Sequence, residues 1–154
     1  MKKKYYQTDE LQSLIDWDKI MEMDRWAGGH DEQMQGLFKN SQVIGHWNEG
    51  GYQGQVATCV RLPNGEYAIY NDYYGSCSGC DAWQDASDEN VKTMCIDLAN
   101  GAYVFETLED VKEFLSDKSE DNKDGNYDWF CEYSNVAGNL LEAINKNKIN
   151  ELLL

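Results

Sequence analysis

Residues 56–70 read VATCVRLPNGEYAIY and predict a β-hairpin. Two runs of β-branched and aromatic residues flank a Pro-Asn-Gly triplet at residues 63–65, which is typical of a tight turn between strands. With the centre of the turn near residues 64 and 65, Val60 pairs with Ile69. This register decides which side chains of the hairpin share a face.

Side chains alternate along a strand, so the register divides the hairpin into two faces. The face expected to line the core holds Val56, Thr58, Val60, Leu62, Tyr67, Ile69 and Tyr73. The opposite face is semi-apolar, which means that either a helix covers it or a ligand binds to it. This second face holds Cys59, Arg61, Ala68, Tyr70 and Tyr74. A slip of one residue would exchange the two faces.

The rest of the chain adds one strand before the hairpin and one after it. Residues 42–47 complete a three-stranded antiparallel meander, and residues 102–106 form a short further strand. A helix over residues 85–99 separates this last strand from the hairpin, so a right-handed crossover places it parallel to the third strand of the meander. Other apolar stripes at helical spacing begin near Thr8, Asp31, Thr107 and Ser134.

Together these elements predict a single acidic α+β domain over residues 1–154. The domain consists of the antiparallel three-stranded meander and one further strand, packed by four to five helices. Residues 118–127 are polar and charged, and they predict a flexible acidic linker before the C-terminal helix.

The charge balance restricts the class of partner. The chain has 28 Asp and Glu residues against 13 Lys and Arg residues, a net charge of −15. Direct binding to nucleic acid requires basic residues that neutralise phosphates, and these are scarce, so a basic protein surface is the natural counterpart. The start MKKKYY lacks the apolar core of a signal peptide, and no apolar run approaches the length of a membrane span. With an odd number of cysteines, this predicts reduced thiols and a cytoplasmic protein.

The stretch that follows the hairpin is the first candidate for a chemical site, because Cys77 and Cys80 have a C-x-x-C spacing there. A zinc site at these two cysteines needs two further ligands, and the sequence has no second cysteine pair. A redox dithiol of the thioredoxin kind needs a βαβ context that is missing here. A structural loop packed against Trp83 is therefore favoured, and no cofactor is expected, with zinc as the alternative.

Two other uses of this region stay open. A cysteine nucleophile would combine Cys77 or Cys80 with His46 as the base and an acid such as Asp72, although no local signature of a cysteine hydrolase surrounds them. Alternatively, a small ligand would bind on the aromatic face of the sheet, through Tyr70, Tyr74 and Trp83.

An acidic run is the most distinctive electrostatic feature. Glu109, Glu113 and Asp117 are spaced four residues apart, where like charges destabilise a helix by about 0.2–0.5 kcal/mol per pair. Such runs are usually solvated faces, but a row that opposes its own helix indicates a binding surface. The expected partner-binding residues are Glu106, Glu109, Asp110, Glu113 and Asp117, with a second patch of Asp85, Asp88 and Glu89.

Residues 72–83 read DYYGSCSGCDAW and resemble a Gly-Ser-Cys-x-Gly-Cys-Asp block in small uncharacterised proteins of bacteriophages and mobile elements. The resemblance implies a phage or prophage origin and no known activity. The acidic composition is similar to that of phage inhibitors that mimic nucleic acid. The leading hypothesis is therefore a non-enzymatic interaction protein that presents carboxylates to a basic host protein, such as a nucleic-acid-binding or defence protein. A phage inhibitor that imitates nucleic acid is the finer form of this hypothesis.

Overall fold

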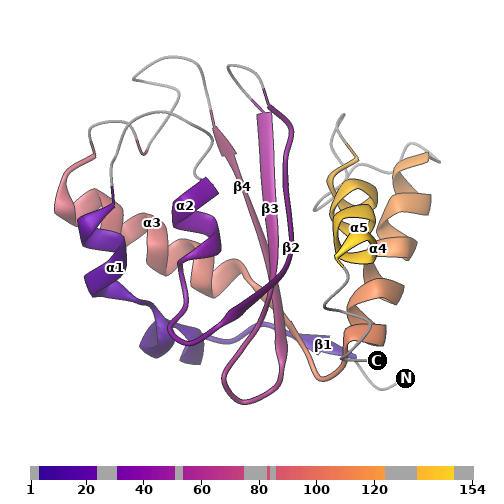
Figure 1. The fold of residues 1–154 in the computed structure, drawn as a ribbon, viewed down its shortest axis with the longest axis horizontal. Coiled ribbons are helices and arrows are strands. Elements are labelled where there is room, and N and C mark those ends of the chain that lie inside the picture. The colour runs from indigo at the N-terminus through magenta and orange to yellow at the C-terminus, as the bar shows by residue number, and fades with distance from the viewer. Residues whose placement is uncertain are drawn as a thin grey trace.

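The computed structural model describes residues 4–23, 31–50, 54–74, 83, 86–123 and 135–147. Figure 1 shows the helices on both sides of a twisted sheet. In chain order the elements are β1 (Tyr5–Tyr6), the 3₁₀ helix η1 (Glu10–Leu14), α1 (Trp17–Glu22), α2 (Asp31–Gln35), β2 (Gln42–Asn48), β3 (Gly54–Arg61), β4 (Tyr67–Tyr74), α3 (Asp88–Gly101), β5 (Tyr103–Phe105), α4 (Leu108–Lys123) and α5 (Val136–Lys146).

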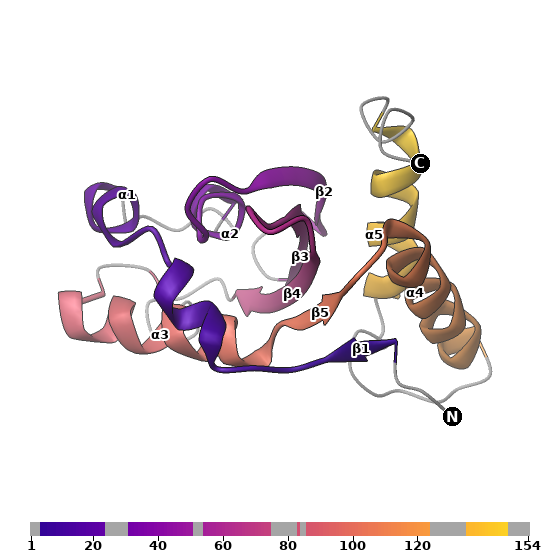
Figure 2. The same ribbon diagram turned by 90° about the horizontal axis from the view of Figure 1, so that it is seen from below.

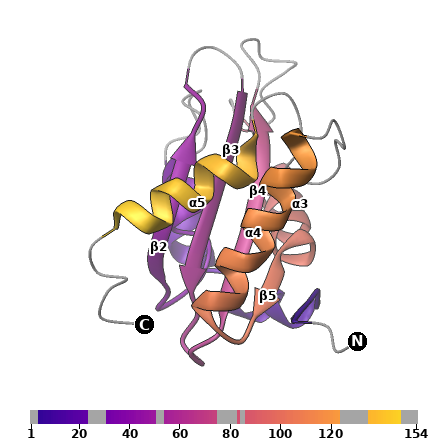
Figure 3. The ribbon, with the colours of Figure 1, turned by 90° about the vertical axis from the view of Figure 1, so that its right-hand side faces the viewer.

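The described strands form one five-stranded sheet in the order β1-β5-β4-β3-β2, and every neighbouring pair is antiparallel. Helices α1, α2 and α3 lie on one side of the sheet, and α4 and α5 lie on the other (Figure 2). Figure 3 looks onto the second side, where α5 crosses in front of the strands and α4 lies beside it. The predicted α+β class is confirmed.

Two apolar clusters hold these layers together. The first joins α1, α2 and α3 to the sheet through even-numbered side chains of the central strands, including Val56, Val60, Ala68 and Tyr70. The second joins α4 and α5 to the sheet through odd-numbered side chains, including Ala57, Cys59, Tyr67 and Ile69. Because helices cover both faces, the semi-apolar face expected from the sequence is part of the interior.

The predicted register of the hairpin is wrong by one residue. Val60 pairs with Ala68, and Ile69 pairs with Cys59, so Val60 and Ile69 lie on opposite faces of the sheet. The cause is the turn, in which three residues separate Leu62 from Glu66. The Leu62 N–H donates to the Glu66 carbonyl at 2.8 Å, and Gly65 has a φ of 91°. A two-residue turn would have given the expected pairing, whereas a three-residue loop with a left-handed glycine shifts it.

The predicted direction of the last strand is also wrong, because β5 runs antiparallel to β4. Helix α3 ends at Gly101 and β5 begins at Tyr103, so Ala102 alone separates them. One extended residue cannot reverse the chain, so β5 runs in the same direction as α3. Because α3 runs opposite to β4, β5 also runs opposite to β4. The crossover expected between parallel strands therefore does not form.

Three further differences concern the ends of the fold. The strand β1 was not predicted; it pairs with β5 through Tyr5 and Phe105. Residues 118–123, expected to begin a flexible linker, continue α4, while residues 124–127 lie outside the described residues. The last helix is capped by the side chain of Asn135, which accepts a hydrogen bond from the Gly138 N–H at 3.2 Å. Ser134, near which this helix was expected to begin, lies outside the described residues.

Candidate functional site

The N-terminus of α4 follows the sequence pattern closely. The Thr107 hydroxyl accepts a hydrogen bond from the Asp110 N–H at 3.1 Å, which satisfies one of the free donors at the start of the helix. Leu108, Val111 and Leu115 are buried against the sheet. The side of α4 that carries Glu109, Glu113 and Asp117 faces the solvent, whereas Phe114 is buried and α5 packs against another side of the helix.

The predicted row of carboxylates lies on this outer side. Glu109, Glu113 and Asp117 are exposed, as is Glu106 just before the helix, and Asp110 is partly buried. We refer to the α4 acidic face as the side chains of Glu106, Glu109, Asp110, Glu113 and Asp117.

The chain itself places a cation against the α4 acidic face. Lys4 Nζ lies 2.7 Å from Glu113 Oε2, and both side chains are 55% exposed. The hydrogen bond and charge of Glu113 raise the pKa of Lys4, and the charges of Asp110 and Asp117 add to this effect. One ammonium group is thus within the field of three carboxylates of this face.

The second acidic patch does not join the first. Asp88 and Glu89 are exposed in the first turn of α3, where Ser87 caps the helix by accepting a hydrogen bond from the Asn90 N–H at 3.2 Å. Helix α3 lies on the opposite side of the sheet from α4 (Figure 2). Asp85, the third member of the predicted patch, lies outside the described residues.

The aromatic residues of the alternative ligand site are interior. Tyr70, Tyr74 and Trp83 are 1–3% exposed, so they do not form an open platform. The Tyr70 hydroxyl donates to the Met34 carbonyl, and burial raises the pKa of this phenol. Trp83 Nε1 donates to Asp72 Oδ2 at 3.3 Å. These rings tie α2 and Trp83 to the sheet.

The cysteines of the C-x-x-C spacing, Cys77 and Cys80, lie outside the described residues, so the zinc, redox and nucleophile interpretations stay predictions. Cys59 and Cys95 are free, buried thiols. Burial raises the pKa of both thiols, that of Cys95 to about 12. Neither thiol is ionised near neutral pH, and neither is accessible as a nucleophile. Among the described residues, no group of three or more His, Cys, Asp or Glu side chains could hold a metal ion.

His46 belongs to a polar network beneath α2. Its Nδ1 lies 2.8 Å from Thr58 Oγ1, and its Nε2 lies 2.6 Å from Asp31 Oδ1. Asn48 Nδ2 donates to the same Asp31 oxygen at 2.9 Å, and Asn48 Oδ1 accepts from the Tyr74 hydroxyl at 2.7 Å. The arrangement contains an acid, an imidazole and a hydroxyl in sequence, but Thr58 is completely buried. No substrate could reach that hydroxyl, so the network anchors the short helix α2 to β2 and β3.

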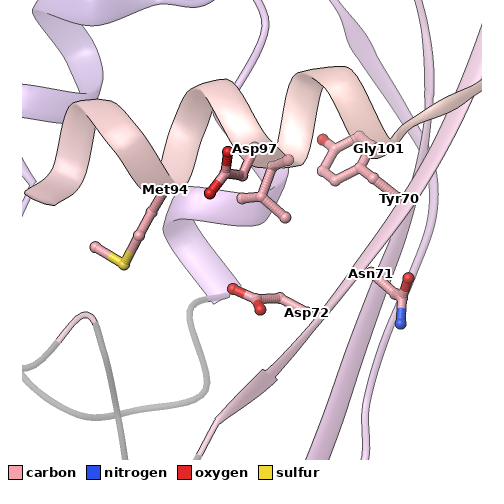
Figure 4. Close-up of a pocket in the computed structure, with 7 residues that line it drawn as sticks. Tyr70, Asn71, Asp72, Met94, Asp97 and Gly101 are labelled. Carbon is pink, nitrogen blue, oxygen red and sulfur yellow. The ribbon is translucent and has the colours of Figure 1, made fainter. Parts of the chain in front are cut away.

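A pocket of about 310 Å³ opens between α3 and β4 (Figure 4). Figure 4 shows the carboxylates of Asp97, from the helix, and Asp72, from the strand, directed into the same space. We call this pocket the α3–β4 groove, and its lining residues are Tyr70, Asn71, Asp72, Met94, Asp97, Leu98 and Gly101.

Lys4 and Asp97 were not predicted from the sequence as site residues. Asp97 is a polar residue that precedes Leu98, a member of the buried stripe of α3. A polar residue next to a buried stripe is typical of any solvated helix face, so the sequence does not mark Asp97 as a site residue. Its relation to Asp72 depends on the register of β4, which the sequence predicted wrongly.

Comparison with protein-family models, curated proteins and solved structures gave no significant match. Within the described part of the chain, no helix has the length and apolar character needed to cross a membrane. The surfaces of this chain are therefore the basis for a proposed function.

Proposed function

We propose that the protein is a non-enzymatic interaction protein that presents the α4 acidic face to a basic protein surface. The contact between Lys4 and Glu113 carries this proposal, because it is an example of how the face receives a lysine. A lysine of a partner would meet the same field from Asp110, Glu113 and Asp117. The partner is a basic protein, and neither nucleic acid nor a membrane is expected to bind directly.

The charge density of α4 supports a finer proposal, that the protein is an inhibitor which imitates nucleic acid. From Glu109 to Asp121 the helix rises by about 18 Å, because each residue adds about 1.5 Å. Six acids in this stretch give about one carboxylate per 3 Å. This spacing is similar to that of the phosphates along one DNA strand, about one per 3.4 Å. The six are Glu109, Asp110, Glu113, Asp117, Glu120 and Asp121. The phage origin and the cytoplasmic location in a bacterial cell are part of this proposal, and the resemblance of residues 72–83 is the ground for that origin.

Affinity capture tests the proposal. The wild-type protein and a triple variant, Glu109→Lys, Glu113→Lys and Asp117→Lys, are each immobilised and exposed to a bacterial lysate, and the retained proteins are identified by mass spectrometry. We expect the wild type to retain a nucleic-acid-binding protein that the triple variant loses. Binding should weaken as salt rises, because exposed charges are screened over about 8 Å at physiological ionic strength. A DNA duplex should displace the retained protein if the face imitates nucleic acid.

A matched control separates the α4 acidic face from net charge. The variant Glu10→Lys, Asp18→Lys and Glu22→Lys makes the same change in charge on η1 and α1, which lie on the other side of the sheet. We expect this control to retain the partner, and circular dichroism should show both variants folded. Equal loss of the partner in both variants would contradict a role for the α4 acidic face. Retention by the α4 variant would contradict it as well.

A further inference from the structure

Within the described residues, the strand β4 has an open edge beside the α3–β4 groove. Strand β5 pairs with Tyr67, Ala68 and Ile69 only, although β4 continues to Tyr74. From Tyr70 onward, β4 has β3 on one side, and no described strand pairs with it on the other. The α3–β4 groove lies along this open part of the strand (Figure 4).

The hydrogen-bond pattern shows which main-chain groups face the open side. In an antiparallel ladder, alternate residues turn both main-chain groups toward the same neighbour. The Leu62 N–H donates to the Glu66 carbonyl, so even-numbered residues of β4 bond to β3, and odd-numbered residues face away from it. Asn71 and Tyr73 therefore point their main-chain groups outward. The Tyr73 N–H is bonded to Asp72 Oδ1 at 2.9 Å, which leaves Asn71 as the residue that can pair with an added strand.

The walls of the groove match one kind of side chain. Met94 and Leu98 supply apolar surface. Figure 4 shows the carboxylates of Asp97 and Asp72 on facing walls of the groove, between Met94 and Tyr70. An aliphatic stem that ends in a cation can use both features at once, as in Lys and Arg. A volume of about 310 Å³ is at the lower limit of known ligand pockets, which suits one side chain better than a whole cofactor.

We propose that the α3–β4 groove binds an extended, basic peptide segment of a partner protein by strand addition at Asn71. Side chains alternate, so the peptide residue opposite Asn71 points away from the groove, and its neighbour, a Lys or Arg, points into it. The cationic head of that neighbour lies between Asp72 and Asp97. This site is on the opposite side of the sheet from the α4 acidic face and does not depend on it.

A synthetic peptide, acetyl-TVTKVTV-amide, is a direct probe. It is titrated into the ¹⁵N-labelled protein, and amide shifts are followed by NMR. We expect saturable shifts at Asn71, Met94 and Asp97. Replacing the lysine with norleucine, which keeps the stem and removes the charge, should weaken binding about tenfold, because a hydrogen bond to a charged group is lost.

N-methylated peptides test strand addition without changing the protein. Methylating the two residues that flank the lysine blocks the amides that can face Asn71, so binding should be lost. Methylating the lysine nitrogen itself is the matched control, because this amide points away from β4, and binding should be retained. Equal binding of both methylated peptides would overturn strand addition.

Protein variants locate the cation. Asp97→Asn should weaken binding of the lysine peptide and leave the norleucine peptide unaffected. Glu142→Gln makes the same charge change on the exposed surface of α5, across the sheet, and should have no effect. The triple reversal on α4 should also leave the peptide affinity unchanged. The proposal is overturned if the peptide causes no shifts at millimolar concentration, if the shifts map to α4, or if norleucine binds as well as lysine.

Discussion

Gly45 lies where α5 approaches β2 most closely, and its replacement by alanine gives a sharp test of how the layers pack. An added Cβ would lie 2.6 Å from Ile144 Cγ1, and 3.1 Å and 3.2 Å from the N and Cα of the same residue. Carbon atoms in good contact are about 3.5–4.0 Å apart, so α5 must move outward by about 1 Å. A rotamer change cannot relieve the contacts with the Ile144 main chain.

The expected loss of stability follows from this displacement. The helix buries Val136, Ala137, Leu140 and Ile144 against the sheet, and a gap of 0.5–1 Å forfeits about a quarter to a half of the dispersion attraction of each contact. Overpacking of this kind typically destabilises by about 1–3 kcal/mol, and the two main-chain contacts place Gly45→Ala near the upper value. Urea unfolding followed by tryptophan fluorescence measures the change.

Two comparisons make the result decisive. Gly101→Ala, at the end of α3, meets no atom within 4 Å and should be neutral or stabilise by up to about 1 kcal/mol through helix propensity. In the background of Ile144→Ala, which removes the nearest atom, the loss caused by Gly45→Ala should shrink by about 1 kcal/mol. If Gly45→Ala unfolds at the same urea concentration as the wild type, the close packing of α5 on β2 is refuted.

Three other predictions concern charge, pH and an anchoring ring. Lys4→Ala should strengthen binding of the basic partner, measured by the retained fraction at fixed salt, because Glu113 loses its internal ion pair; weaker binding would show that Lys4 takes part in the interface. The unfolding free energy should fall by about 1.4 kcal/mol per pH unit from Cys95 as pH rises from about 8.5 toward 12, because the unfolded thiol loses its proton while burial keeps the native one protonated. In Cys95→Ala this alkaline decline in urea stability should be shallower, and an unchanged slope would contradict the raised pKa. Trp83→Phe should lower the free energy of unfolding by about 1–2 kcal/mol, because Asp72 loses its indole donor while most of the apolar volume of the side chain stays. Thermal unfolding measures this change, and an unchanged melting temperature would show that this hydrogen bond contributes nothing to stability.

Short local sequence patterns predicted much of the fold. The turn at residues 63–65 joins antiparallel strands, as predicted, because glycine there takes a left-handed conformation. Helix starts near residues 85 and 107 were also predicted, and Ser87 and Thr107 cap these helices, since a hydroxyl that satisfies a free N–H is a property of a few adjacent residues. These features depend on short stretches of chain, which is why the sequence alone predicts them.

The sequence-based predictions were wrong where contacts between residues far apart in the chain determine the structure. One extra residue in the turn moved every side chain of β4 to the other face, and no apolar pattern opposed this, since both faces are buried. Strand β1 has two residues and exists only because β5 pairs with it. The α3–β4 groove depends on this register and on the end of β5, so its two carboxylates could not be related from sequence. The exposure of the α4 acidic face was predictable, because it required only helical spacing around Leu108, Val111 and Leu115.

In α4, the burial of apolar side chains outweighs the repulsion between the carboxylates of the α4 acidic face. Two of its like-charged pairs, Glu109–Glu113 and Glu113–Asp117, oppose the helix by about 0.2–0.5 kcal/mol each, whereas burying an aliphatic side chain such as Val111 or Leu115 contributes about 1.5–3 kcal/mol. Packing on the sheet therefore holds a row of carboxylates that the segment alone would not keep helical. It follows that a peptide of residues 106–123 should show little helix by circular dichroism and compete poorly with the intact protein for the partner. A peptide that is helical, or that competes equally well, would show that the row does not need the sheet beneath it.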